Sequence, residues 1–114
     1  MTPMDVFITE GNVDKYLAKL HETWNHRERG TLLSLVREEE GRMGHRREHL
    51  ERANGRATEG RERLEKQRDL LANASLPEEH RERARFLLET MEMTQLLLEG
   101  HLRWMCERFD QSRL

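Results

Sequence analysis

An apolar repeat of seven residues runs through the middle of this 114-residue chain. Its members stand seven positions apart without interruption: Val36, Met43, Leu50, Ala57, Leu64 and Leu71. Most of the residues between them are polar or charged, with Arg and Glu the commonest, so only a narrow stripe is apolar. A stripe with this period indicates a long α-helix that buries one edge against another helix.

The composition agrees with a helical protein. Charged residues make up 37% of the chain and hydrophobic residues 35%. About half of all residues are Ala, Glu, Lys, Leu or Arg, a bias that is typical of coiled coils and long helices. Pro3 and Pro77 are the only prolines. We therefore predict an all-α fold class.

Turn and capping signals predict three helices. We expect an extended lead-in over residues 1–11 and one helical domain over residues 12–114. Within it, helices are expected at about 13–24, 26–72 and 76–112. The short first helix would precede a long antiparallel hairpin of the other two, which would pack like a coiled coil.

Local residues set these boundaries. Asn12 and Asn25 are good N-caps for the first two helices. Ser75 and Glu78 have the spacing of a capping box at the start of the third helix. Within the long second helix, Gly41–Gly44 is the stretch where a kink or break is most expected.

The expected last helix has two apolar faces. The first is a continuous stripe formed by Ala84, Leu88, Met91, Gln95, Leu98, Leu102, Met105 and Phe109. The second consists of Phe86, Met93, Leu97 and Trp104. A hairpin partner covers only one face, so these four residues are interface candidates, Trp being favoured at binding hot spots. The second neighbour is either the first helix or another subunit, and we expect a homodimeric helical bundle.

Positive charge is concentrated in residues 42–68, which hold nine Lys or Arg and five Asp or Glu. Such a segment is suited to contacts with nucleic-acid phosphates. It contains no aromatic residue on which a base would stack. Pairs spaced i,i+4, such as Glu59 with Arg63, are typical of a solvated helix face. A nucleic-acid partner is therefore the disfavoured alternative.

One short group of residues has the spacing of a metal site. His45, Glu48 and His49 read H-x-x-E-H, which in one group of zinc peptidases places two ligands and a general base on a helix. Catalytic zinc needs a third protein ligand, and the adjacent arginines would repel a cation. We interpret both histidines as exposed side chains and expect no metal, no cofactor and no catalytic residues.

Two further features concern location. No apolar run of about 18 residues is present, and no secretory signal is visible at the N-terminus. Cys106 is the single cysteine and has no partner for an internal disulfide. We expect a cytoplasmic protein without membrane contact.

Two sets of segments resemble modules of small uncharacterised alphaproteobacterial proteins. The first set is Asn12–Tyr16, Thr31–Leu33 and Glu38–Glu40. The second set is His49–Ala53, Glu59–Gly60, Gln67, Leu87–Thr90 and Thr94–Gln95. The resemblance implies an all-helical, cytoplasmic bacterial protein of unknown function, and it supplies no site residues.

Together these patterns favour a non-enzymatic helical interaction or scaffold protein. Its expected partners are a second copy of the chain and an unidentified protein. The alternative is a nucleic-acid-associated regulator that uses the basic segment 42–68.

Overall fold

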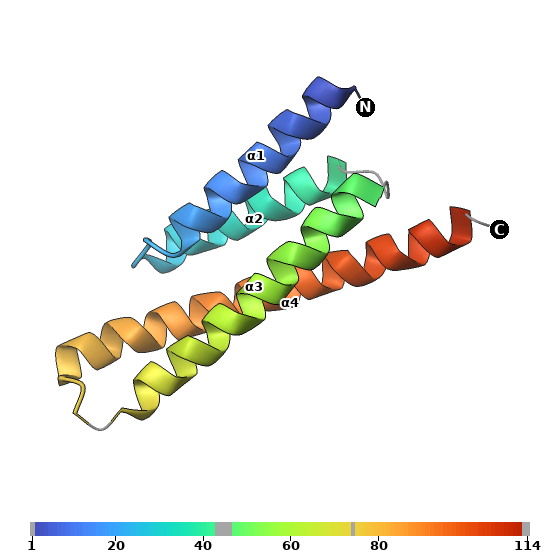
Figure 1. Ribbon diagram of the computed structural model, residues 1–114. Coiled ribbons are helices and arrows are strands. Elements are labelled where there is room, and N and C mark those ends of the chain that lie inside the picture. Colours follow the sequence, from blue (N-terminus) through green and yellow to red (C-terminus); the bar gives the residue numbers. More distant parts are fainter. Residues whose placement is uncertain (1, 43–46, 74, 113–114) are drawn as a thin grey trace.

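The chain forms two antiparallel helical hairpins in the computed structural model, which describes residues 2–42, 47–73 and 75–112, with side chains as far as residue 108. The helices in these ranges are α1 (Pro3–Leu20), α2 (His26–Arg42), α3 (Arg47–Ala72) and α4 (Glu78–Ser112). Figure 1 shows α1 paired with α2 and α3 paired with α4. All regular structure in the described ranges is helical, which confirms the predicted fold class.

The first helix corrects the prediction of an extended lead-in over residues 1–11. Helix α1 begins at Pro3 and continues through Asn12, which therefore caps nothing. Thr2 is the N-cap: its hydroxyl accepts a hydrogen bond from the Asp5 backbone N–H at 3.1 Å. The Asp5 carboxylate accepts one from the Thr2 backbone N–H at 2.9 Å, completing a capping box. Pro3 suits the first turn, because an N–H group at that position would have no hydrogen-bond partner within the helix.

The prediction of one helix over residues 26–72 is also wrong. Helix α2 ends at Arg42, and α3, which begins at Arg47, runs back in the opposite direction (Figure 1). A continuous helix of that length would measure about 70 Å, whereas the longest dimension of the molecule is 53 Å. The stretch Gly41–Gly44 was the predicted break, and α2 does end within it. Met43 of the apolar repeat and residues 44–46 lie outside the described residues.

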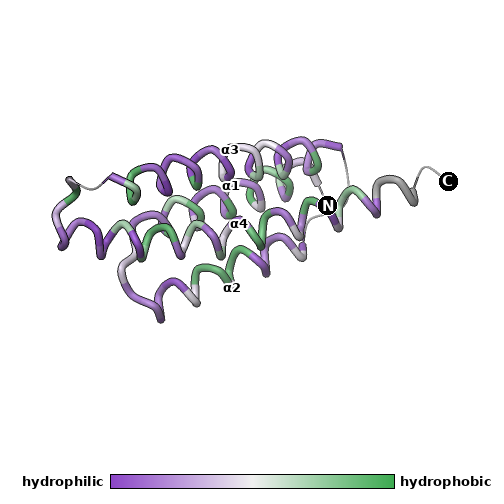
Figure 2. Tube along the Cα trace, turned by 90° about the horizontal axis from the view of Figure 1, so that it is seen from below, coloured by the Kyte–Doolittle hydropathy of each residue, from purple (hydrophilic) through white to green (hydrophobic). Residues whose placement is uncertain are grey.

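Large aliphatic side chains hold α1 against α2. Val13 and Leu20 from α1 form one buried cluster with Leu32 and Val36 from α2. Leu97 of α4 packs against this cluster from the other hairpin. Figure 2 shows the hydrophobic segments of α2 and α4, in green, in the middle of the molecule. Val36 of the apolar repeat therefore belongs to the first hairpin, not to the seam of the second.

The start of α2 confirms Asn25 as a cap. The Asn25 side-chain oxygen accepts hydrogen bonds from the backbone N–H groups of Arg27 at 2.8 Å and Glu28 at 3.1 Å. These are two of the N–H groups that a helix start leaves without a partner inside the helix. The start of α2 after the α1–α2 turn is thus stabilised by the Asn25 cap that the sequence predicts.

The seam between α3 and α4 consists of small and polar side chains. Ala57 is fully buried, and its carbonyl oxygen accepts a hydrogen bond from the Gln95 side chain at 2.8 Å. Gly60 makes room for that glutamine, because a Cβ at Gly60 would overlap the Gln95 side-chain oxygen. Gln67 likewise donates to the Ala84 carbonyl at 3.0 Å. The predicted antiparallel packing of these two segments is confirmed, and the two helices approach closely at Gly60.

The turn before α4 is where the sequence places it, but its capping differs. Helix α4 begins at Glu78, so Glu78 and Ser75 do not form the predicted capping box. Instead the Asn73 side-chain oxygen accepts hydrogen bonds from the Ser75 backbone N–H and hydroxyl, at 3.1 and 2.7 Å. Arg81 ties the turn to α3 by donating to the Leu71 carbonyl at 2.8 Å.

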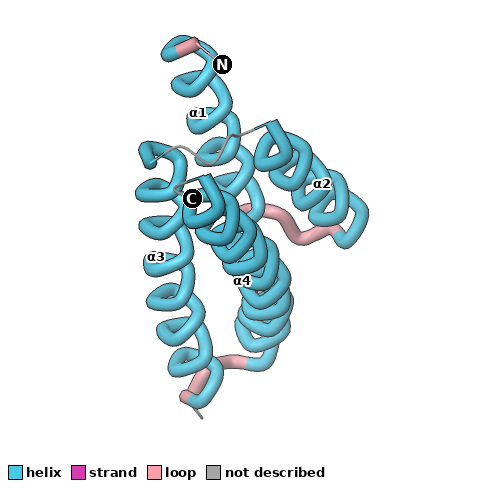
Figure 3. The backbone as a smooth tube through the Cα atoms, turned by 90° about the vertical axis from the view of Figure 1, so that its right-hand side faces the viewer, coloured by secondary structure: helices cyan, strands magenta, loops and turns pink. Residues whose placement is uncertain are grey.

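Arg29 fastens α2 to α4. Its side chain is 6% exposed and donates to the Thr90 hydroxyl at 3.3 Å and to the Glu89 carboxylate at 2.9 Å. The guanidinium also lies 4.7 Å from the centroid of the Phe86 ring. Seen from the end, α4 lies between α3 and α2 (Figure 3). Within the chain, the second neighbour of α4 is therefore α2, which corrects the prediction of the first helix or another subunit.

Candidate functional site

The structure describes two of the three residues that have metal-site spacing, Glu48 and His49. His45 lies outside the described residues, and Glu48 is exposed. His49 is 0% exposed, which corrects its interpretation as a solvated side chain. In the described part of the chain, no group of three or more His, Cys, Asp or Glu side chains has the geometry to hold a metal ion.

Ionisable side chains meet in the interior where the two hairpins join. We call this group the buried charge cluster; its members are Glu10 of α1, Glu40 of α2, His49 and Arg56 of α3, and His101 of α4. All four helices contribute to it. The Nδ1 atom of His49 lies 2.6 Å from Oε1 of Glu10, and the Arg56 guanidinium contacts the other oxygen of the same carboxylate.

Burial keeps two members of the cluster uncharged near neutral pH. Desolvation raises the pKa of Glu40 to about 8, although the positive charges of Arg56 and Arg37 oppose this rise. Desolvation also lowers the pKa of His101 to about 4, helped by Arg56 and His49 and opposed by Glu10. Glu10 is the member whose charge is directly compensated, by Arg56.

The contacts within the cluster connect helices to one another. The Nε2 atoms of His49 and His101 are buried and have no hydrogen-bond partner among the described protein groups. Glu10 and Arg56 neutralise each other, and Arg56 also binds the Glu10 carbonyl oxygen at 3.2 Å. The sequence carried no signal for this cluster, because Glu10 and His101 are far in sequence from Glu40, His49 and Arg56.

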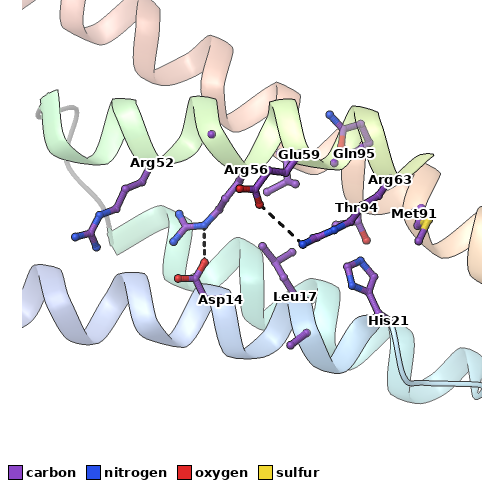
Figure 4. Close-up of a pocket in the computed structure, with 14 residues that line it drawn as sticks. Asp14, Leu17, His21, Arg52, Arg56, Glu59, Arg63, Met91, Thr94 and Gln95 are labelled. Atoms are coloured by element: carbon purple, nitrogen blue, oxygen red, sulfur yellow. Dashed lines mark hydrogen bonds and ion pairs between the residues drawn. The ribbon is translucent and has the colours of Figure 1, made fainter. Parts of the chain in front are cut away.

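A second feature is a groove of about 620 Å³ that is lined by residues of α1, α3 and α4. Figure 4 shows Arg52, Arg56 and Arg63 of α3 along one side, with Asp14 and His21 of α1 opposite. Arg56 pairs with Asp14 at 2.9 Å. Burial, followed by the nearby charge of Arg63, lowers the pKa of His21. The groove is lined by charges of both signs and does not concentrate positive charge for a phosphate.

Three further arginines of the basic segment 42–68 also have a carboxylate within ion-pair distance. Arg42 pairs with Glu39 at 2.8 Å, and Arg61 pairs with Glu99 of α4 at 2.5 Å. Arg63 lies 3.9 Å from Glu59, the i,i+4 pair that the sequence predicts. Arginines with a carboxylate partner contribute less to a field that attracts phosphate.

The third feature is an apolar groove of about 710 Å³ between α2 and the outer face of α4, which we call the α2–α4 groove. Its apolar walls are Leu33 of α2 and Met93, Leu96, Leu97 and Trp104 of α4. Leu96 is 77% exposed, Met93 41% and Trp104 39%. Such a concentration of exposed apolar side chains around a concave surface is typical of a binding site.

Three of the four predicted interface residues line this groove: Met93, Leu97 and Trp104. Phe86 lies outside it, with its ring centroid 6.3 Å from that of Trp24 and the Arg29 guanidinium stacked on it. Sequence reasoning missed Leu96, the most exposed of the group. It is the first of three consecutive leucines, Leu96–Leu98, so the sequence does not show directly which of the three is most exposed.

Comparisons with known proteins add no assignment. No family model matches the chain, and no curated protein or solved structure has significant similarity to it. Within the described residues, no helix is both long enough and apolar enough to cross a membrane.

Proposed function

We propose that this chain is a non-enzymatic helical interaction or scaffold module whose working surface is the α2–α4 groove. The observation that carries the proposal is the exposure of Leu96, Met93 and Trp104 around one apolar concavity. Grooves of this kind bind the apolar face of an amphipathic helix. The proposal includes a homodimeric state, a cytoplasmic location and the bacterial origin that the sequence resemblance implies.

The packing of α4 supports this assignment. On one side the Gln95 and Gln67 hydrogen bonds lock α4 to α3. On another side Arg29 fixes it to α2. A groove wall that is held from two sides loses little conformational freedom when a partner binds, which favours affinity.

The nucleic-acid alternative receives less support. Arg42, Arg56 and Arg61 are each paired with a carboxylate. The alternative predicts binding to duplex or single-stranded DNA that weakens steeply as salt concentration rises. Binding of that kind at low ionic strength would favour the regulator over the interaction module.

The proposal is tested by photo-crosslinking in the host cell. A benzophenone amino acid at Leu96 should form a discrete adduct with a protein partner. The same amino acid at Leu70, an exposed apolar position of α3 outside the groove (43% exposed), is the matched control. The adduct at position 96 should fall several-fold when Trp104→Ala is added, while helix content stays unchanged. Equal adduct yields at positions 96 and 70, or no effect of Trp104→Ala, would contradict the proposal.

A further inference from the structure

The amino-terminal end of α1 exposes a second apolar surface. Met4, Phe7 and Ile8 are 65, 72 and 51% exposed. Their spacing of i, i+3 and i+4 places them on one face of the helix, away from the buried face that carries Val13 and Leu20. We call these three residues the α1 anchor. Anchors with this spacing are the means by which an amphipathic helix binds an apolar groove.

The α1 anchor is already ordered before any partner binds. The capping box of Thr2 and Asp5 stabilises the start of the helix at Pro3, so the first turn carries Met4 in a helical position. A preformed helix does not have to meet the cost of folding on binding.

The α2–α4 groove has the matching chemistry. Its walls are apolar, and it includes Gly41 and Gly100, where an added Cβ would meet nothing within 4 Å. The backbone of a second helix can therefore approach both walls closely. The charges are also complementary, since Arg37 lies at the groove and Asp5 lies beside Met4 in the anchor turn.

The two surfaces lie at the same end of the molecule. The amino end of α1, the carboxyl end of α2 and the carboxyl half of α4 point toward the side of Figure 1 where both chain termini are marked. A two-fold axis at that end would place each anchor in the groove of the other copy. In such an isologous dimer both anchors and both grooves are occupied, so assembly stops at two subunits.

We infer that the α2–α4 groove binds the α1 anchor of a second copy of this chain, so that two copies exchange their amino-terminal turns. This inference rests on the proposed role of the groove as the working surface. It goes beyond that role by naming the occupant.

Solution mass tests the inference on the full chain. Light scattering should give twice the 13.7 kDa chain mass at micromolar concentration. Phe7→Glu and Leu96→Glu should each return the mass to that of one chain, with helix content unchanged because both side chains are exposed. Leu70→Glu should remain dimeric. A wild-type mass of one chain at every concentration, or a mass that grows beyond two chains, would overturn the two-fold exchange.

Disulfide trapping tests the contact itself. In a Cys106→Ser background, Phe7→Cys protein mixed with Leu96→Cys protein should give a disulfide-linked heterodimer under mild oxidation. Phe7→Cys mixed with Leu70→Cys is the control and should give much less. Equal yields in the two mixtures would overturn the inference. If the chain is monomeric but Leu96 still crosslinks to another protein in cells, only the inference about the second copy fails. If Leu96 gives no specific adduct, the proposed function itself fails.

Discussion

The His49 Nδ1 atom lies 2.6 Å from Glu10 Oε1, with the two side chains 0 and 1% exposed. The pair joins α3 to α1 across 39 positions of sequence. Arg56 supplies positive charge to the same carboxylate. Because an unpaired charge is costly in the interior, this carboxylate fixes the position of the first hairpin against the second.

We expect Glu10→Gln to lower the free energy of unfolding by about 2–4 kcal/mol, because it leaves the nearly buried Arg56 guanidinium without its interior counter-charge. Asp14→Asn is the matched control, since Asp14 binds the same guanidinium from a side chain that is 67% exposed. Because an exposed ion pair contributes little to stability, Asp14→Asn should lower the free energy of unfolding by only about 0.5 kcal/mol. Urea unfolding of both variants measures the difference. Equal losses would show that burial of Glu10 is not what makes its charge important.

The raised pKa of Glu40 predicts a stability that depends on pH. With a pKa of about 8 in the folded chain against an ordinary value of 4.5, Glu40 keeps a proton that the unfolded chain releases between these two pH values. The associated stability is fully present below pH 4.5 and is lost as pH rises toward 8, by at most about 1.4 kcal/mol per pH unit.

His101 has the opposite effect in a lower pH window. Its pKa of about 4 lies below the ordinary 6.5, so its contribution is lost as pH falls from 6.5 to 4. The two effects oppose each other between pH 4.5 and 6.5, and only that of Glu40 remains between 6.5 and 8. As the pH rises from 6.5 to 8, the free energy of unfolding of Glu40→Gln should therefore increase by about 1–2 kcal/mol relative to that of the wild type. Urea unfolding at several pH values measures this difference. Parallel curves for the two proteins would rule out Glu40 as the titrating group.

Two glycines of α3 should respond oppositely to alanine. Gly55→Ala should raise the free energy of unfolding by about 0.5–1 kcal/mol, because nothing lies within 4 Å of the added Cβ and alanine favours the helix. Gly60→Ala should lower it by about 1 kcal/mol, because the new Cβ displaces the Gln95 side chain from the Ala57 carbonyl. Chemical denaturation of both variants checks the sign. An equal gain for both would mean that Gln95 moves away without loss.

The candidate sites were predictable only in part. Met93, Leu97 and Trp104 were identified because a helix with two apolar faces needs two neighbours, and that requirement can be read from spacing. His49 was misread as exposed, because it stands among arginines and glutamates that are themselves solvated. Its buried partner is Glu10, and no local pattern connects two residues so far apart in the chain.

Helix formation itself was determined by the sequence. The charged, Leu-rich composition, the cap at Asn25 and the turn before Glu78 specify helical segments through interactions within a few residues of each other. The small residues of α3, Ala57 and Gly60 among them, likewise allow a close helical neighbour.

Only the tertiary structure decided how these helices are arranged. The seven-residue repeat continues in phase from α2 into α3, yet Val36 packs against α1 while Ala57 packs against α4. A repeat records which side of a helix is apolar, but not whether the helix is continuous or which neighbour covers it. Contacts such as those of Glu10 with His49 and Arg56 form only when the two hairpins meet, so no local pattern in the sequence encodes them.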